Sequence, residues 1–181
     1  TDYSQGSVRQ TGGTYDLALS GSGFFTVSVT DKAGEVHTRY TRDGRFHLTK
    51  DGLLVDADGN AVQGQNGNIT IDPSSKNVSI SATGQITADG ELVDTLNIVD
   101  FEDYDYLKKY GDTMYEPVDG ATTKDAEGEI LQGYTEQSNV NVVREMVDMI
   151  TITRAYEASQ KVIHSYDSML DKSVNQVGAL K

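Results

Sequence analysis

The last quarter of the chain, from Ser138 to about Val177, most constrains what this sequence can fold into. This stretch contains no proline and no glycine, so neither of the two strongest helix breakers interrupts it. Its apolar residues recur with alternating four- and three-residue spacing, which is the period of a coiled-coil seam. We therefore predict one long helix here, capped at its start by Ser138, Asn139 or Asn141.

The predicted seam combines apolar residues with three polar interruptions. The candidate assembly interface consists of Val142, Met146, Met149, Tyr156, Ile163, Leu170 and Val174. The interruptions are Thr153, Gln160 and Asp167. A second apolar row accompanies the seam at Ala155, Ser159, Val162, Tyr166 and Met169, and the start is widened by Val143, Val147 and Ile150. An apolar surface wider than one seam indicates a helix that touches more than one neighbour.

The length of this helix argues for a role in assembly. A helix of about 39 residues would be roughly 58 Å long at 1.5 Å per residue. We expect it to exceed the width of the remaining body and to extend beyond it. The alternative is a core helix packed on its own sheet, which the length and the two apolar rows disfavour.

Charge is distributed unevenly along the 181 residues. The formal net charge is −13, and the five acids and five bases after Ser138 cancel, so the excess lies on residues 1–137. An acidic chain is a poor partner for nucleic acid or an anionic membrane surface. No apolar run is long enough for membrane insertion, and the absence of cysteine excludes disulfides and thiolate metal sites.

Residues 15–137 are predicted to form a β-rich body, preceded by an extended arm at residues 1–14. Five turn signals punctuate the body, at Asp43-Gly44, Asp51-Gly52, Asp58-Gly59, Asn66-Gly67 and Asp89-Gly90. Such pairs supply the positive φ angles of tight hairpins. Short strands are predicted at 25–29, 45–48, 53–55, 61–62, 69–71, 78–80, 85–87 and 96–99. Residues 130–134 are predicted to be a last short strand or the approach to the helix. The fold class is therefore a mainly β body of hairpins and meanders, plus one long C-terminal helix of coiled-coil type.

Residues 100–130 are predicted to be an irregular surface segment. They contain Tyr104, Tyr106, Tyr110 and Tyr115, which we expect to hold the segment against the body, and a loop from Asp119 to Glu129. A tyrosine cluster also allows a different function. The chain could be an adhesion or carbohydrate-binding module on a coiled-coil stalk, with these tyrosines as an exposed platform.

Catalytic chemistry is weakly represented. His37, His47 and His164 have neither metal-ligand spacing nor a nucleophile motif beside them. Asp56-Ala57-Asp58-Gly59-Asn60 resembles a calcium loop only in part, because the glycine comes too early and Gly67 stands where a glutamate is needed. A β-fold hydrolase with two close carboxylates remains possible among 28 acids. We predict no catalytic residues, no cofactor, no metal site and no small-molecule substrate.

Four motifs in order resemble the bacterial flagellar rod and hook family, most closely its distal rod members. They are residues 5–12 with 17–27, residues 40–46 with 58–62, residues 132–143, and Arg154-Ala155-Tyr156-Glu157. The resemblance covers nearly the whole chain.

This resemblance implies a non-enzymatic structural subunit of the flagellar basal body. In the family, an N-terminal and a C-terminal helix pair in the inner layer of a hollow axial tube, and the β body forms the outer layer. The implied partners are copies of the chain, other rod and hook subunits, and the flagellar export apparatus that carries subunits out of the cytoplasm. The family's N-terminal helix would precede Thr1, so we expect this chain to be part of a longer protein, and the unpaired helix to fray or to pair with another molecule.

Overall fold

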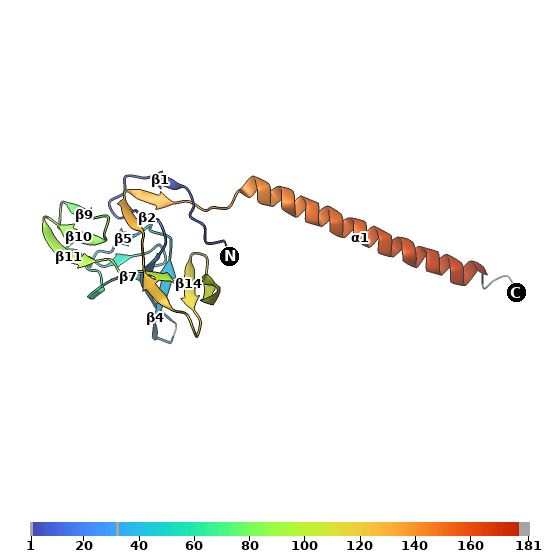
Figure 1. Ribbon diagram of the computed structural model, residues 1–181, viewed down its shortest axis with the longest axis horizontal. Helices are drawn as coiled ribbons and strands as arrows, with labels where there is room; N and C mark the ends of the chain where they lie inside the picture. Colours follow the sequence, from blue (N-terminus) through green and yellow to red (C-terminus); the bar gives the residue numbers. More distant parts are fainter. Residues whose placement is uncertain (1, 32, 178–181) are drawn as a thin grey trace. The chain divides into compact units, whose positions relative to one another are not determined.

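Phe24–Thr30 forms the central strand of the body, β3, because its residues alternate between apolar and small polar side chains. The structure is a computed structural model that describes residues 2–31 and 33–177. The chain divides into two compact units, Thr1–Asn139 and Val140–Lys181. The first contains the strands and the second contains the helix (Figure 1). The predicted fold class, a β body plus one long helix, is confirmed.

The strands of the described chain are short. In order they are β1 (Val8–Gln10), β2 (Leu17–Ser20), β3, β4 (Val36–Thr41), β5 (His47–Leu48), β6 (Leu54–Val55), β7 (Ala61–Gly64), β8 (Gly67–Asn68), β9 (Val78–Ile80), β10 (Gln85–Ala88), β11 (Glu91–Thr95), β12 (Ile98–Phe101), β13 (Leu107–Tyr110), β14 (Met114–Pro117), β15 (Thr123–Asp125), β16 (Glu129–Gln132) and β17 (Tyr134–Glu136). A 3-10 turn, η1 (Tyr104–Tyr106), precedes β13.

Four sheets share these strands. The largest has the order β13-β14-β4-β3-β7-β6-β5, with β12 joining β3 to β15 and β8 attached to β7. The smaller ones are β11-β10-β9, β16-β2 and β1-β17. Every strand pair is antiparallel, as expected for hairpins joined by tight turns. The main core connects the sheets through buried residues such as Leu19, Phe25, Val62, Ile86 and Ile130.

Four of the five predicted turn signals join paired strands. Gly52, Gly59, Gly67 and Gly90 all have positive φ angles, and Asp89 joins Gly90 in the left-handed region with φ 51, which is the pattern of a type I′ hairpin. Gly44 is different, because its φ is not positive. A Cβ at Gly44 would lie 1.8 Å from the carbonyl oxygen of Leu17, so this glycine allows two backbone segments to approach closely.

Two predictions about the body were wrong. Residues 69–71 form only an isolated bridge, Leu53↔Thr70, although Ile69 and Ile71 are fully buried. Residues 100–130 are not an irregular segment, since they contain β13, β14, β15 and the end of β12. The loop predicted from Asp119 to Glu129 includes β15, which pairs with β12.

The helix α1 (Val142–Val177) has 36 residues, three fewer than predicted. Among the three candidate caps the structure selects Asn141, whose side-chain Oδ1 accepts a hydrogen bond from Arg144 N at 3.2 Å. Its carbonyl accepts from Glu145 N at 3.0 Å. Glu145 also places a negative charge in the first turn, where it favours the helix dipole.

Candidate assembly surface

Every α1 side chain from Val142 to Ser173 is exposed. This includes the predicted interface residues Val142, Met146, Met149, Tyr156, Ile163 and Leu170, each between 59% and 68% exposed. Val174 belongs to α1, but its side chain lies outside the described residues. Exposed apolar rows of this kind are typical of interaction surfaces, so this row is the candidate assembly surface.

Covering the six described seam residues would contribute on the order of 10 kcal/mol, at about 1.5–3 kcal/mol per side chain. Ordering the helix costs about 1–2 kcal/mol per residue of backbone entropy, only part of which its own hydrogen bonds offset. The helix therefore gains most when another surface covers the seam. The expected fraying of the uncovered helix stays a prediction.

The polar interruptions of the seam differ in how strongly they oppose burial. The Thr153 hydroxyl donates to the Met149 carbonyl at 2.8 Å, so its polar group is satisfied within the helix and its methyl can face an apolar partner. The Gln160 amide makes a long contact of 3.5 Å with the Tyr156 hydroxyl. Gln160 and Asp167 thus remain polar members of the seam, and such residues fix the register of coiled coils at a cost in stability.

The N-terminal arm and the chain leading to α1 are held side by side. Strand β1 pairs with β17 in the register Val8↔Glu136 to Gln10↔Tyr134, and the two strands lie together in Figure 1 as the blue and orange arrows. The Asn139 amide donates to the carbonyl of Ser4 at 2.9 Å and to that of Asp2 at 3.3 Å. Residues 2–4 are therefore fixed against the residue three positions before α1.

A partly buried ion pair reinforces this arrangement. Arg42 Nε lies 3.1 Å from Glu136 Oε2, with side-chain exposures of 21% and 11%. Arg42 Nη1 also donates to the carbonyls of Gly21 and Gly23 at 2.9 and 2.8 Å. The other carboxylate oxygen of Glu136 accepts from Gly6 N at 2.8 Å. One arginine and one glutamate thus join the β4–β5 turn, the residues before β3, the arm and β17.

An open pocket of about 520 Å³ lies beside this ion pair. Its acids include Asp43 and Glu136, which are paired with Arg45 and Arg42 respectively. The hydrolase hypothesis requires two close carboxyl groups, one of them with a raised pKa. Among the described residues, the carboxyl groups with a shifted pKa all have it lowered, namely Asp2, Asp31, Asp72 and Asp100. Two of the pocket's carboxylates are thus paired with arginines, and hydrogen bonds from Ser4 lower the pKa of the third, Asp2.

Asp100 is the most buried of these groups. Burial opposes its ionisation, but hydrogen bonds from Tyr104, Ser22 and Phe101 N, together with Lys124, lower its pKa below the ordinary value. The Tyr104 hydroxyl donates to Asp100 Oδ1 at 2.7 Å, and Lys124 Nζ lies 3.1 Å from Oδ2. Burial and this hydrogen bond raise the pKa of Tyr104 to about 12. The network fastens β15 and η1 to β12.

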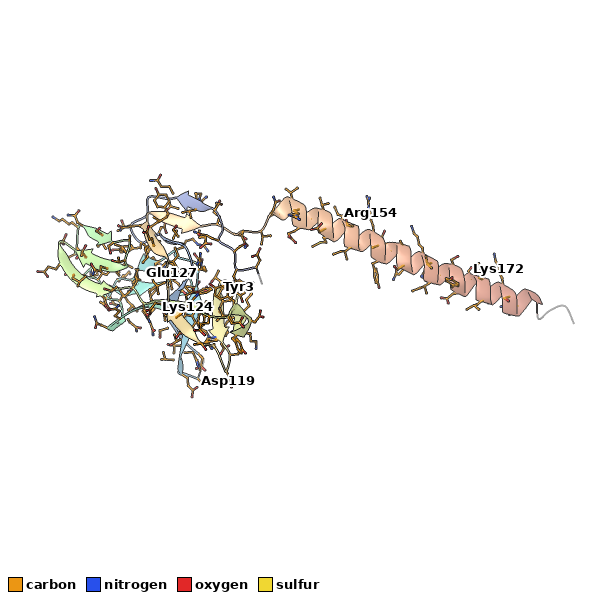
Figure 2. All side chains as sticks on the ribbon, viewed as in Figure 1. Tyr3, Asp119, Lys124, Glu127, Arg154 and Lys172 are labelled. Atoms are coloured by element: carbon orange, nitrogen blue, oxygen red, sulfur yellow. The ribbon has the colours of Figure 1, made fainter. Side chains whose placement is uncertain are left out.

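The tyrosines of residues 104–115 do not form one exposed platform. Tyr104 and Tyr115 pack in an aromatic cluster with Tyr3 and Phe24, near the position of Tyr3 labelled in Figure 2. Tyr106 and Tyr110 are exposed, and the guanidinium of Arg39 lies 4.8 Å from the Tyr110 ring centre. The prediction that tyrosines hold this segment to the body is confirmed for Tyr104 and Tyr115.

The acidic turns have structural roles. The Asp56 carboxylate accepts hydrogen bonds from Asp58 N and Asn60 N, so it stabilises the β6–β7 turn. This turn is the segment Asp56–Asn60 that partly resembles a calcium loop. Asp31, Glu35 and His37 lie close together, a grouping that no sequence motif indicated. Asp31 Oδ1 there accepts from Ala33 N and Glu35 N, which stabilises the β3–β4 turn. No helix among the described residues is long and apolar enough to cross a membrane.

Two family models match this chain. Residues 18–88 match the model described as flagellar hook protein FlgE/F/G D1 domain, and residues 131–177 match that of the flagellar basal body rod FlgEFG protein C-terminal. The first match covers β2 to β10, and the second covers the chain from β16 to the end of α1.

Curated relatives align over almost all of the chain. The flagellar basal-body rod protein FlgG of Buchnera aphidicola subsp. Schizaphis graminum is 36% identical over 183 residues, covering 94% of this chain and 68% of the relative. FlgF of Caulobacter vibrioides is 34% identical over 181 residues, with 99% and 72% covered. FlgG of Bacillus subtilis is 32% identical over 194 residues, with 97% and 70% covered.

Proposed function

Because this chain belongs to the FlgE/F/G family of bacterial flagellar rod and hook proteins, we propose that it acts as a structural subunit of the flagellar basal-body rod. It is most similar to the FlgG branch, it is located in the basal body, and it assembles with other rod and hook subunits. Its work is mechanical: the assembled subunits carry motor torque to the hook. In this role the chain performs no catalysis and needs no cofactor or small-molecule substrate.

The observation that carries the assembly mechanism is the exposed seam of α1. Six described apolar residues along one side of a 36-residue helix are open to solvent, which is costly unless another helix covers them. We propose that Val142, Met146, Met149, Tyr156, Ile163 and Leu170, with Val174, pack against helices of the same tube. The β body adds the second contact layer.

Torque transmission requires a stiff connection between body and helix. The pairing of β1 with β17, the Arg42–Glu136 ion pair and the Asn139 hydrogen bonds fasten the residues just before α1 to the body. We propose that these contacts keep the last residues of the body rigid under load.

Delivery by the flagellar export apparatus fits the composition. The chain contains no cysteine, so no disulfide has to be reduced before an unfolded chain passes through a narrow channel. We propose export as an unfolded chain, with α1 gaining its partners only on assembly. The apparatus is thus a transient partner and the rod subunits are permanent ones.

Electron microscopy of basal bodies tests this function. A strain lacking the gene is expected to lose an axial segment of the rod and to stop swimming, and the wild-type gene is expected to restore both. Intact rods of normal length in the deletion strain, with normal swimming, would contradict the proposed function.

A further inference from the structure

The apolar surface of α1 changes side along the helix. In the heptad frame set by the seam, Val143, Val147 and Ile150 occupy positions next to the seam on one side, and we call them the early wall. The late wall is Ile152, Ala155, Ser159, Val162, Tyr166 and Met169, and it occupies the corresponding positions on the other side of the seam. The large apolar residues of both walls are exposed.

Each wall is apolar only where the opposite wall is polar. At the level of the early wall, the opposite side of the seam carries the charged residues Glu145 and Asp148. At the level of the late wall, the early wall's side of the seam is polar and carries Arg154, Glu157, Lys161 and His164. Figure 2 shows the Arg154 and Lys172 side chains extending from the same side of α1. The change occurs between Ile150 and Ile152, within an unbroken helix.

We infer that the early wall of one copy of this chain packs against the late wall of a second copy, with the two helices parallel and displaced along their axes. The inference rests on the proposed rod function, in which equivalent helices stand side by side with their seams facing the same way. In such an array the right side of each helix meets the left side of the next. A contact between unlike surfaces of identical subunits is heterologous, and it propagates instead of closing as a dimer.

The displacement follows from the positions of the walls. Val147 is central to the early wall and Val162 to the late wall, so matching them requires a shift of about 15 residues, or roughly 22 Å at 1.5 Å per residue. Helices at equal height would instead press Asp148 against the early wall and Lys161 against the late wall. Burying those charges without partners would be unfavourable. With the shift, the early wall lies at the level of Ser159, Val162 and Tyr166, and Glu145 and Asp148 lie beyond the contact. Arg154 lies at the level of Met169, at the edge of the contact.

A symmetric pair of helices explains the pattern less well. An antiparallel pair with seams on the same side brings like walls together, early against early or late against late. Either choice leaves the other wall uncovered, whereas the displaced parallel contact covers the early wall and the middle of the late wall with one repeated interface. A second copy is therefore the occupant that uses both walls.

Cysteine cross-linking tests this inference, because residues 1–181 contain no cysteine of their own. Ile150→Cys is combined in turn with Ser159→Cys, Val162→Cys or Tyr166→Cys in the chromosomal gene, and isolated basal bodies are oxidised. Any disulfide must join two copies, because the paired positions are at least 9 residues, or about 13 Å, apart on one helix and a disulfide bridges Cα atoms at most about 7 Å apart. We expect at least one of the three pairs to give a ladder of cross-linked subunits.

The matched control is Asp148→Cys with Lys161→Cys, which places cysteines on the same two walls in their charged halves. The inferred displacement separates these positions, so no ladder is expected. A ladder from this control, or dimers from Ile150→Cys or Val162→Cys alone, would overturn the inference. Intact rods in which none of the early–late pairs cross-links would also overturn the inference. The proposed rod function would then still stand, because rods and swimming are scored separately from cross-linking.

A charge exchange covers the case in which a cysteine variant fails to assemble. Ile150→Glu is expected to reduce swimming at least tenfold, and adding Val162→Lys in the same chain is expected to restore it in part. Adding Val143→Lys, on the same wall, is the control and should not restore it. Equal restoration by both second changes would refute the early–late contact.

Discussion

The Arg42–Glu136 ion pair gives the sharpest test of how the body is held together at the base of α1. Replacing Arg42 with Met removes the ion pair and the two hydrogen bonds to the carbonyls of Gly21 and Gly23. It leaves the Glu136 carboxylate, which is 11% exposed, with the Gly6 N–H as its remaining partner. Breaking a buried pair by removing one partner costs about 3–5 kcal/mol. Because a fifth of Arg42 remains exposed, we expect about 3 kcal/mol.

Urea unfolding followed by tyrosine fluorescence measures this loss. The chain has no tryptophan, and eight of its ten tyrosines precede residue 138, so the signal reports mainly on the body. The matched control is Arg45→Met, which breaks an ion pair with Asp43 whose arginine is 63% exposed. Exposed pairs contribute about 0.2–1 kcal/mol. If Arg42→Met destabilises the body no more than Arg45→Met does, the ion pair is not what holds β17 and the arm to the body.

A double-mutant cycle separates the pair from its surroundings. Glu136→Gln alone leaves the Arg42 charge without its partner, and the double variant leaves neither charge. We expect the double variant to lose clearly less than the sum of the single losses, because the two residues interact directly. Additive losses would show that Arg42 acts through its other contacts, the two carbonyls and the Phe24 ring, and not through Glu136.

Three further predictions follow from particular residues. Gly44→Ala should lower the free energy of unfolding by about 3 kcal/mol or more, because the new Cβ would meet the Leu17 carbonyl. Gly59→Ala has open space around its Cβ but a φ of +87, so it should cost about 1–2 kcal/mol. Equal losses in urea unfolding would contradict the close approach at Gly44. The folded pKa of Tyr104, about 12, exceeds its ordinary value of 10.0, so the contribution of its hydroxyl to stability is full below pH 10 and disappears as the pH rises to 12. Tyr104→Phe should therefore weaken the loss of stability at alkaline pH. An unchanged pH profile of stability would refute this role of Tyr104. The isolated chain should show less helix by circular dichroism than 36 residues require, and assembly should restore it; full helicity in the dilute monomer would contradict the expected fraying.

The body was predictable where the chain pairs with its near neighbours. Asp51-Gly52, Asp58-Gly59 and Asp89-Gly90 each mark a hairpin whose two strands follow one another directly, so a local turn signal was sufficient. Strand β1 lacks such a signal, because Val8 pairs with Glu136, 128 positions along the chain. Strand β14 forms a hairpin with β13, but its turn contains Gly111-Asp112 and not an Asp-Gly or Asn-Gly pair, so no turn signal indicated it. It also joins the large sheet through Met114↔Thr41 and Tyr115↔Tyr40.

The candidate surface was predictable in part. Heptad spacing located the seam and both apolar rows of α1, because a helix places residues on its sides by spacing alone. Spacing did not indicate that the Thr153 hydroxyl would be satisfied by the Met149 carbonyl. Nor did it indicate the Arg42–Glu136 pair, whose members are 94 residues apart. Those features depend on packing and on distant contacts, which sequence patterns do not record.

The central claim, that the seam of α1 is an assembly surface, is tested most directly by placing the same charge on two sides of the helix. Met149→Asp and Ile163→Asp put a carboxylate in the seam, and Thr151→Asp and Ser165→Asp put it on the side that faces away from the seam. Swimming and rod length in electron micrographs are measured at matched expression. We expect the seam variants to abolish both while the β body unfolds at the wild-type urea concentration, and the control variants to keep both. Normal rods and swimming in the seam variants would contradict the claim.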